Sequence, residues 1–238
     1  MQYLHKIFFM SLLVVGTVAF DAIETPFGKT DKITGGSGNY ICQSAGHFTN
    51  NMQLVSVIGD DFDQNELSYL KSIGTDIDGV QVKEGEKSFF WSGKYHMDLN
   101  RRDTLVTDLN VLAAFDPILP EKYKDAEFLI LGNIDPTLQA KVIAQMTTRP
   151  KLIAMDTMNF WMDIALEPLK TVLKMVDLLI VNEEEARQLT NEYSLVKAAT
   201  KIREMGPKFL IIKKGEHGAL LFHGNRVFFA PALPLEDV

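Results

Sequence analysis

Acidic and amide side chains stand where short apolar segments of this sequence end. Asp21 follows one such segment, Asp156 a second and Asn182 a third. In open α/β sheets, ligands bind outside the carboxyl ends of the strands, where a carboxylate can accept hydrogen bonds from ligand hydroxyls. Taken alone, Asp21 is more simply a turn or capping residue, and Asp156 fits either interpretation. The pattern therefore predicts candidate ligand contacts without deciding them.

A glycine-rich turn is the second candidate for a ligand contact. Residues 34–39 read Thr-Gly-Gly-Ser-Gly-Asn and precede a predicted helix that runs to about Phe48. Clustered glycines let the backbone approach a ligand closely, with free N–H groups pointing at it. The segment matches neither the dinucleotide fingerprint, since no strand directly precedes it, nor Walker A, since no Gly-Lys-Ser/Thr follows. Two interpretations of the segment remain, a flexible hinge and a turn that contacts a ligand.

The start of a later predicted helix could organise a cation. Asn182 and Glu185 are three residues apart and therefore share a helix face, where they could orient a hydrated Mg²⁺ beside nucleotide phosphates. The simpler interpretation is that Glu183, Glu184 and Glu185 are three equivalent charges that favour the helix dipole. Both interpretations predict a helix that begins at Asn182.

Residues 213–218 read Lys-Lys-Gly-Glu-His-Gly and link a buried strand to a predicted hairpin. Lys213 and its neighbour are either ordinary surface charge or groups that face phosphate. His217 lies between Glu and Gly, and is more simply a turn residue than a catalyst.

These residues need a scaffold, and the sequence predicts an α/β protein with a parallel sheet. Short apolar runs alternate with segments of helical periodicity, which is typical of that class. Helices are expected at 164–176 and at 194–206, the latter with Ser194 as its N-cap and Gly206-Pro207 as its stop. The predicted strands are Leu12–Val18, Leu54–Ile58, Phe128–Leu131, Leu152–Met155, Leu178–Val181, Phe209–Ile212, and a hairpin of Ala219–Phe222 and Arg226–Phe229.

One long segment, 80–106, lacks helical periodicity. Phe89, Trp91 and Tyr95 alternate with polar residues, so these three aromatic rings share one face of a strand. We expect a small β insertion here. It is either an edge hairpin packed on the core or a lid over a cleft, and the same aromatic face could pair with another subunit.

Residues 7–20 form an apolar run after one lysine, which allows two interpretations. A signal peptide is one, although no Ala-x-Ala site follows the run. A buried first strand is the other, with Met10 as an alternative start and residues 1–9 as a short extension. We favour the strand.

Composition excludes several classes of protein. The chain has 238 residues, 24 Lys+Arg against 31 Asp+Glu, and 46% hydrophobic residues, which is ordinary for one large folded domain or two small ones. A net charge of −7 disfavours a nucleic-acid partner. Cys42 is the single cysteine, so no internal disulfide can form, and the five histidines show no metal-site spacing. We expect a cytoplasmic protein without a membrane partner.

The order of these motifs resembles that of the ribokinase-like, PfkB-type family of carbohydrate kinases. The resemblance covers Met10 to Val238. Its most specific parts are the Gly-Asp-Asp-Phe block at 59–62 and the Asn-x-x-Glu motif at 182–185.

The resemblance implies a doubly wound, mostly parallel α/β sheet with a small β-sheet lid inserted at about 22–34 and 80–110. It implies transfer of the ATP γ-phosphoryl group to a sugar or nucleoside hydroxyl, with Mg²⁺, and a homodimer through the lid is a further expectation. The residues that it places on the substrate side are Asp21, Gly35, Gly36, Asn39 and Asp156. Those that it places on the nucleotide side are Asn182, Glu185, Lys213, Gly215 and Gly218, with Asn182 and Glu185 also serving the metal.

The sequence departs from the family pattern in three places. Tyr40 stands where the family usually has asparagine, with Asn39 one place early, and Asp63 stands where glycine is common. The family's Asp-Thr-Gly-Ala-Gly-Asp motif, which supplies the catalytic base, does not occur in the 238 residues. We therefore expect a sugar kinase that is truncated and inactive as written. The alternatives are a non-catalytic sugar-binding protein, an adenosine-type nucleoside kinase of the same fold, and a secreted binding protein.

Overall fold

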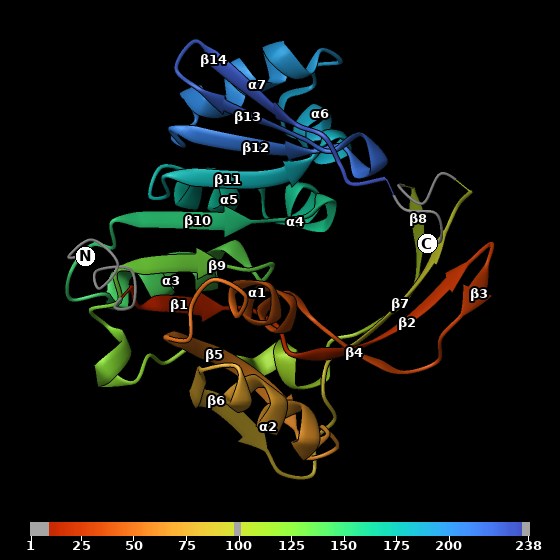
Figure 1. The fold of residues 1–238 in the computed structure, drawn as a ribbon, viewed down its shortest axis with the longest axis vertical. Helices are drawn as coiled ribbons and strands as arrows, with labels where there is room; N and C mark the ends of the chain where they lie inside the picture. Colours follow the sequence, from red (N-terminus) through yellow and green to blue (C-terminus); the bar gives the residue numbers. More distant parts are fainter. Residues whose placement is uncertain (1–9, 98–100, 235–238) are drawn as a thin grey trace, which may run out of the picture. The chain divides into compact units, whose positions relative to one another are not determined.

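The chain divides into two units, shown as a ribbon in Figure 1. The computed structural model describes residues 10–97 and 101–234. Unit 1 takes the chain up to Gly132 together with Ala144–Lys151, and unit 2 takes Asn133–Ile143 together with the chain from Leu152 onward. The expected extension at residues 1–9 lies outside the described residues. Among the described residues, no helix has both the length and the apolar composition needed to cross a membrane.

Unit 1 holds nine strands, two α-helices and two 3₁₀-helices among its described residues. They are β1 (Leu12–Val15), β2 (Ala19–Thr25), β3 (Gly28–Lys29), β4 (Ile33–Gly35), α1 (Ser37–Ala45), β5 (Met52–Gly59), α2 (Gln64–Ser72), β6 (Thr75–Lys83), β7 (Phe90–Tyr95), β8 (Arg102–Asp108), η2 (Asn110–Ala114), η3 (Glu121–Tyr123) and β9 (Phe128–Leu131). Helix α3 (Pro136–Gln145) follows and runs across the division.

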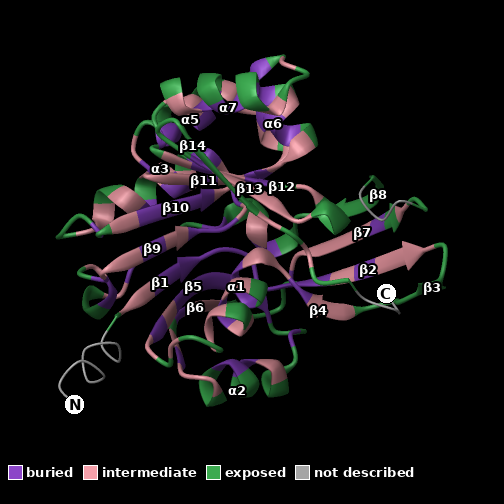
Figure 2. Ribbon diagram, turned by 45° about the horizontal axis from the view of Figure 1, so that its top comes forward, coloured by how far each residue is buried: buried purple, intermediate pink, exposed green. Residues whose placement is uncertain are grey.

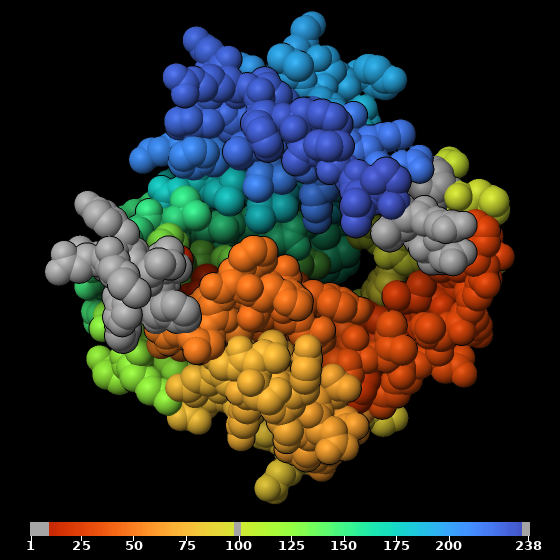
Figure 3. Space-filling view, viewed as in Figure 1, coloured from red at the N-terminus to blue at the C-terminus, as the bar shows by residue number. Residues whose placement is uncertain are grey.

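The larger sheet of unit 1 is parallel, in the order β9-β1-β5-β6. Its strands are continuous apolar runs, and Leu13, Val14 and Val15 of β1 are fully buried. Such runs are what a strand needs when both faces of the sheet are covered. Helices α1 and α2 pack side by side on this unit, where their residues form the orange and amber surface of Figure 3. Cys42 of α1 lies in the resulting core, fully buried.

The small sheet of unit 1 has the order β3-β2-β7-β8, with β4 paired to β2. Its strands lie in and around the two segments predicted as insertions, and their role as a lid stays a prediction. The first part begins at Ala19 rather than at about 22, so Asp21 is part of this sheet. In the second part, residues 80–83 belong to β6 of the larger sheet. Strand β8 is an edge strand that is exposed along its whole length, and its pairing with another subunit stays a prediction.

The predicted strand Leu12–Val18 was too long, because β1 ends at Val15. Gly16 leaves the strand to pack against the start of α1, where a Cβ on Gly16 would lie 2.8 Å from the Gly38 nitrogen. The backbone N–H of Val18 donates to the Ser56 hydroxyl at 3.0 Å. Asp21 therefore does not follow the first strand but lies within the second.

The Gly-Asp-Asp-Phe block joins the small sheet to the body of unit 1. Asp60 accepts a hydrogen bond from the Gly85 N–H at 2.8 Å, and Asp61 accepts one from the Ser88 N–H at 2.7 Å. Residues 85–88 lead into β7, so these carboxylates fix one entry to the small sheet. The same block holds the other entry, since Asp61 lies 3.5 Å from the Lys32 ammonium just before β4.

Unit 2 contains the remaining elements. They are β10 (Leu152–Asp156), α4 (Asn159–Ile164), α5 (Leu166–Leu173), β11 (Leu178–Asn182), α6 (Glu183–Thr190), α7 (Leu195–Glu204), β12 (Phe209–Lys213), η4 (Gly215–His217), β13 (Ala219–His223) and β14 (Arg226–Ala230). Strands β10, β11 and β12 are parallel, and β13 and β14 extend the sheet as an antiparallel hairpin. Figure 2 shows buried purple segments along these strands and exposed green segments on the helices.

Two helix predictions for unit 2 meet different outcomes. The helix at 194–206 is confirmed as α7, although the Ser194 side chain makes no capping hydrogen bond. The helix at 164–176 is present as the shorter α5, which begins at Leu166 because Ala165 leaves helical geometry at φ −139° and ψ 36°. The predicted strands and the hairpin of unit 2 are confirmed, each ending one residue later than predicted.

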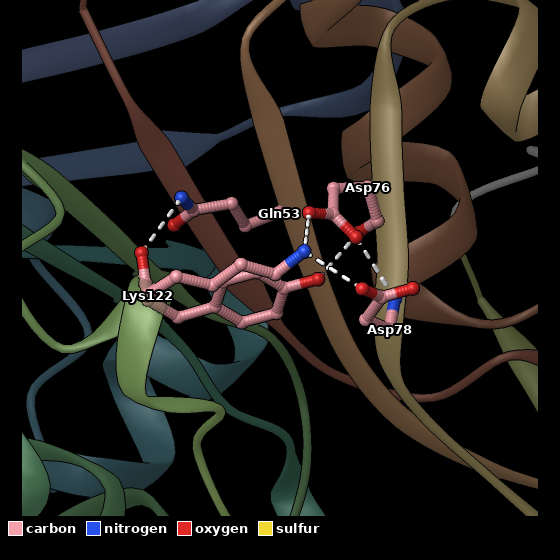
Figure 4. A network of polar contacts seen from close by, with 5 residues as sticks. Gln53, Asp76, Asp78 and Lys122 are labelled. Carbon is pink, nitrogen blue, oxygen red and sulfur yellow. Dashed lines mark hydrogen bonds and ion pairs between the residues drawn. The ribbon is translucent and has the colours of Figure 1, made fainter.

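A polar network ties η3 to β6 in unit 1 (Figure 4). The Lys122 ammonium lies 2.5 Å from a carboxylate oxygen of Asp76 and 2.7 Å from one of Asp78. The fully buried Tyr123 donates its hydroxyl to the Asp76 carbonyl at 3.1 Å. The Gln53 amide donates to the Lys122 carbonyl at 3.4 Å. The network fixes the segment between the small sheet and β9 against the larger sheet.

Candidate functional site

Asp21 lies in the middle of β2, on the face of the small sheet opposite the core. Its neighbour Phe20 is 7% exposed and packs against Phe62, with ring centroids 5.0 Å apart, while the Lys32 ammonium lies 3.7 Å from the Phe20 centroid. Successive side chains of a strand point to opposite faces. Packing of Phe20 therefore directs Asp21 to the other face of the sheet. The residue of β7 that pairs with Asp21 in register is Trp91.

The glycine turn holds the Asp21 carboxylate closely. The Gly36 N–H donates a hydrogen bond to it. A Cβ on Gly35 would collide with the carboxylate itself, so only glycine fits at that position. Burial raises the pKa of Asp21 to about 6, against the lowering effect of the Gly36 hydrogen bond. The carboxylate is therefore poorly solvated and has little hydrogen bonding of its own, a state that ligand hydroxyls would relieve.

Tyr40 interacts electrostatically with both Asp21 and Tyr95, and we call the three residues the Asp21 cluster. Burial raises the pKa of Tyr40, and the charges of Asp21 and Tyr95 raise it further. Tyr40 is 49% exposed, and its hydroxyl donates to the Thr34 carbonyl at 3.5 Å. Trp91 lies beside them, with its ring over Gly93 and its indole N–H donated to the Thr104 hydroxyl at 3.3 Å.

The expectation of free N–H groups at the glycine turn was wrong. The N–H groups of Gly38 and Asn39 donate to the Thr17 carbonyl, at 2.8 and 3.3 Å, and that of Ser37 donates to the Thr17 hydroxyl at 3.0 Å. The glycines serve the approach of α1 to the β1–β2 connection, since Gly36 has φ 94° and a Cβ there would meet the Thr17 carbonyl.

Asn39 lies inside unit 1. It is 1% exposed, and its side-chain oxygen accepts a hydrogen bond from the Gln43 amide at 3.0 Å. The next residue, Tyr40, is the one that is exposed beside Asp21. Substrate contact by Asn39 therefore stays a prediction that the burial of its side chain does not favour.

In unit 2, three of the expected residues end three neighbouring parallel strands. Asp156 is the last residue of β10, Asn182 of β11 and Lys213 of β12. Asn182 and Lys213 are partners in register, and the Lys213 ammonium lies 3.9 Å from an Asp156 carboxylate oxygen. The structure thus gathers an acid, an amide and a cation at one edge of this sheet, as the strand-end rule predicts.

Asn182 and Glu185 form a capping box at the start of α6. The Asn182 side chain accepts the Glu185 N–H at 2.8 Å, and the Glu185 carboxylate accepts the Asn182 N–H at 2.7 Å. The three glutamates are therefore not equivalent. Glu185 is 3% exposed, Glu183 lies 3.7 Å from Arg187, and Glu184 is exposed.

Gly215 and Gly218 bound the short helix η4 directly after β12. Both have positive φ, at 55° and 80°, and the Lys214 N–H donates to the Gly218 carbonyl at 2.8 Å. A Cβ on Gly218 would collide with the Ala230 carbonyl at the end of β14. Turn geometry accounts for both glycines, and their contact with a nucleotide stays a prediction.

The expected residues fall into two sets. Asp21, Gly35, Gly36 and Asn39 belong to unit 1, and the others belong to unit 2. Asn159, three residues after Asp156, bonds through its amide to the Gln188 side chain of α6 rather than to Asp156. Tyr40 and Tyr95 were not expected as site residues. The signals that could have found them were the departure from asparagine at position 40 and the shared aromatic face at 89–95.

One known family matches almost the whole sequence. The pattern described as the pfkB family of carbohydrate kinases matches residues 11–238. The chain belongs to this family. The expected resemblance is thereby confirmed, and the protein is a pfkB-family kinase.

The relatives of this pfkB-family chain include two nucleoside kinases and a putative ribokinase. It is 29% identical over 231 residues to a cytidine kinase of Thermococcus kodakarensis, which covers 95% of this chain and 81% of that protein. A nucleoside kinase of Burkholderia thailandensis, solved in complex with inosine, superposes with a TM-score of 0.76 at 19% identity, over 96% of this chain and 78% of that one. A putative ribokinase II of E. coli, solved with ATP and Mg²⁺, gives 0.75 at 20% identity, over 96% and 80%.

These likenesses confirm the predicted fold class, a doubly wound, mostly parallel α/β sheet with a small β-sheet. Magnesium is expected of the pfkB family, and the side chains present are compatible with one mode of Mg²⁺ binding. Within the described ranges, no three His, Cys, Asp or Glu side chains are grouped to hold a metal ion. Asn182 and Glu185 already cap α6 with one oxygen each. The residues therefore fit an ion that is held through water rather than by a protein cage.

Proposed function

We propose that the protein is an ATP-dependent nucleoside kinase whose acceptor site is the Asp21 cluster. The observation that carries this proposal is a partly buried carboxylate on the small sheet that interacts electrostatically with Tyr40 of α1, whose side chain is half exposed. The carboxylate would accept hydrogen bonds from ribose hydroxyls. Hydrogen bonds to a charged group contribute about 1.5–3 kcal/mol, which is enough to orient a small ligand.

Tyr40 favours a nucleoside over a free sugar. In the resemblance described above, position 40 carries an amide, which suits a sugar hydroxyl. Tyr40 instead offers an aromatic face that is half exposed next to Asp21. Stacking of a base on an aromatic side chain contributes about 1–3 kcal/mol. The names of two relatives, a cytidine kinase and a nucleoside kinase solved with inosine, support the same choice.

The strand ends of unit 2 are proposed to serve ATP. Lys213 supplies a positive charge for phosphate, Asp156 orients that lysine, and the Asn182–Glu185 capping box faces water bound to the ion. Bound Mg²⁺ would neutralise phosphate charge. Phosphoryl transfer depends mostly on positioning and electrostatic stabilisation, so residues of this kind account for much of what such a protein contributes.

The decisive experiment is calorimetric binding rather than turnover, because the motif to which the resemblance assigns the base does not occur in these residues. Cytidine, inosine and free ribose are titrated into the 238-residue chain with Mg²⁺ and a non-hydrolysable ATP analogue. We expect at least one nucleoside to bind about tenfold or more tightly than ribose. Equal affinity for ribose and nucleosides would support the sugar kinase expected from the sequence, and no binding would reject the acceptor site.

Two variants, one test and one control, accompany the binding measurement. Tyr40→Asn restores the residue typical of the family and should reduce the preference for nucleosides over ribose. Asp103→Asn is the matched control, since Asp103 is an exposed carboxylate of the same sheet that pairs with His96 at 3.1 Å. It should bind nucleosides as the unaltered chain does.

A further inference from the structure

We propose that Thr17 is a positioning residue that holds the Gly35-Gly36 turn against Asp21 and so sets the affinity of Asp21 for its ligand. The ligand part of this proposal rests on the proposed function, whereas the link between Thr17 and the Asp21 carboxylate does not. Thr17 lies in the short connection between β1 and β2 and is 8% exposed.

Thr17 bonds the start of α1 through its carbonyl, its hydroxyl and its N–H. The carbonyl accepts the N–H groups of Gly38 and Asn39, and the hydroxyl accepts the N–H of Ser37 at 3.0 Å. In return, the Thr17 N–H donates to the Ser37 hydroxyl at 3.3 Å, and the two hydroxyls also lie 3.3 Å apart. A helix start leaves several N–H groups without intrahelical partners, and here one residue satisfies three of them.

The Gly36 N–H, directly before this start, goes to Asp21 instead. The turn is therefore clamped on two sides, by Thr17 after Gly36 and by the carboxylate beside Gly35. Close packing leaves little room for another arrangement, because a Cβ on Gly36 would meet the Thr17 carbonyl and one on Gly132 would lie about 2.5 Å from the Ser37 hydroxyl oxygen. Loosening Thr17 should therefore move the Gly36 donor away from Asp21.

The groups that face Asp21 are few in kind, so a change in its pKa can be traced to one contact. The Tyr40 phenol comes from α1, and burial and the charge of Asp21 raise its pKa, so it stays neutral near pH 7. Tyr95 of β7 interacts electrostatically with Tyr40. Lys32 lies against Phe20 on the opposite face of β2 and pairs with Asp61. The Gly36 hydrogen bond is thus the local contact that stabilises the ionised carboxylate, and its loss raises the pKa of Asp21.

The test compares Thr17→Val, which keeps the shape of the side chain and removes the hydroxyl, with Thr17→Ser, which keeps the hydroxyl. The carboxyl resonance of Asp21 is titrated by NMR in the ligand-free chain, and the Kd for cytidine is measured from pH 5 to 8. For Thr17→Val we expect the pKa of Asp21 to rise by about half a unit to one unit. The ionised fraction of Asp21 near pH 6.5 then falls, so the Kd there should rise about 1.5-fold to threefold. Thr17→Ser should leave the pKa of Asp21 and the Kd for cytidine as they are in the unaltered chain.

Ser56→Ala is the matched control. Ser56 is 1% exposed, and its hydroxyl holds the N–H of Val18, the residue after Thr17. This variant should lower the melting temperature without moving the pKa of Asp21 or the pH profile of binding. Equal effects of Ser56→Ala and Thr17→Val on the pKa would reduce Thr17 to an ordinary structural role and overturn the proposal, as would a folded Thr17→Val chain with an unchanged pKa.

The role of Thr17 can still be tested if the unaltered chain binds no nucleoside or if Thr17→Val does not fold. If the unaltered chain binds no nucleoside, the proposed function fails, and the NMR titration alone decides the role of Thr17. If Thr17→Val does not fold, Ser37→Ala takes its place, since it removes the hydroxyl that meets Thr17 and keeps the Ser37 N–H. An unchanged Asp21 pKa in Ser37→Ala would then count against the clamp.

Discussion

Phe20 and Asp21 are consecutive residues of β2 with opposite environments. Phe20 lies between the Phe62 ring, 5.0 Å away, and the Lys32 ammonium, 3.7 Å away, while Asp21 meets the turn at Gly35 and Gly36 and interacts electrostatically with Tyr40. Because alternation along a strand is fixed, packing of one side chain orients the other. The core of unit 1 thus determines which way the candidate acceptor carboxylate points.

Asp21→Ala should weaken nucleoside binding by one to two orders of magnitude, since charged hydrogen bonds contribute about 1.5–3 kcal/mol. The affinity for ATP should change little, because the residues proposed for ATP belong to other strands. Calorimetry with each ligand alone measures both. A nucleoside Kd that does not move would remove Asp21 from the site.

Asp21 should also make stability depend on pH. Its pKa is about 6 in the folded chain, against an ordinary value of 3.8 for an exposed aspartate, so the folded state binds more protons between these values. Stability contributed by the protonated form is complete below about pH 4 and is lost as the pH rises through 6. Asp21→Asn should therefore stabilise the chain at pH 8, by about 1–2 kcal/mol after solvent screening, and hardly at pH 4. Urea titrations at the two pH values test this, and an equal gain at both would contradict it.

Substitutions of the three glutamates of α6 should have different effects. Glu185→Ala breaks the capping box and should cost about 1–2 kcal/mol of stability, whereas Glu184→Ala should cost almost nothing because Glu184 is exposed. Glu185→Gln keeps an acceptor for the Asn182 N–H but removes the charge. It should raise the Mg²⁺ concentration needed for tight ATP binding at little cost in stability. If Glu183→Gln and Glu184→Gln shift that concentration equally, the helix dipole explains all three and the metal role is dropped.

Lys213→Met should weaken ATP binding about threefold to tenfold, because it removes the charge that lies 3.9 Å from Asp156 at the end of β12. Nucleoside binding should stay the same. Lys214→Met, one residue along, is the comparison. Similar losses from both lysines would indicate general surface charge rather than a placed contact.

Lys122→Met should lower stability only slightly, because the side chain of the lysine between Asp76 and Asp78 is half exposed and its ion pairs are screened by solvent. Tyr123→Phe should cost about 1 kcal/mol or more, since its buried hydroxyl donates to the Asp76 carbonyl. Thermal unfolding of the two variants compares them. A larger loss from Lys122→Met would show that the ion pairs, rather than the buried tyrosine, fix η3.

The sequence was informative where one local pattern decides the structure. Buried parallel strands such as β9 are continuous apolar runs, and α7 has a clear apolar face and a Gly-Pro stop, so these elements could be predicted closely. Local patterns failed at Gly16–Val18, where β1 stops because of groups 20 to 38 residues further along, at Ser37, Gly38 and Ser56. Apolar composition continues through this connection, and no window of sequence shows that the chain turns there.

The candidate site also has parts that the sequence predicts and parts that it does not. Strand-end placement of Asp156, Asn182 and Lys213 follows from parallel topology and was predictable. The interaction of Tyr40 with Asp21 was not predictable, because it depends on how the small sheet meets α1. The Gly-Asp-Asp-Phe block was conspicuous in the sequence, yet its role in fixing residues 85–88 and Lys32 emerged only from contacts across 25 to 29 residues.

Cys42 turns the packing of α1 into a measurable signal. It is the only thiol in the sequence and is fully buried in the core of unit 1, where burial raises its pKa to about 12. A thiolate is the species that alkylating reagents attack, so the native chain should be almost inert to them. Labelling can then proceed only through openings that bring Cys42 into solvent, and its rate reports how often the helix behind the Asp21 turn comes away from the sheet.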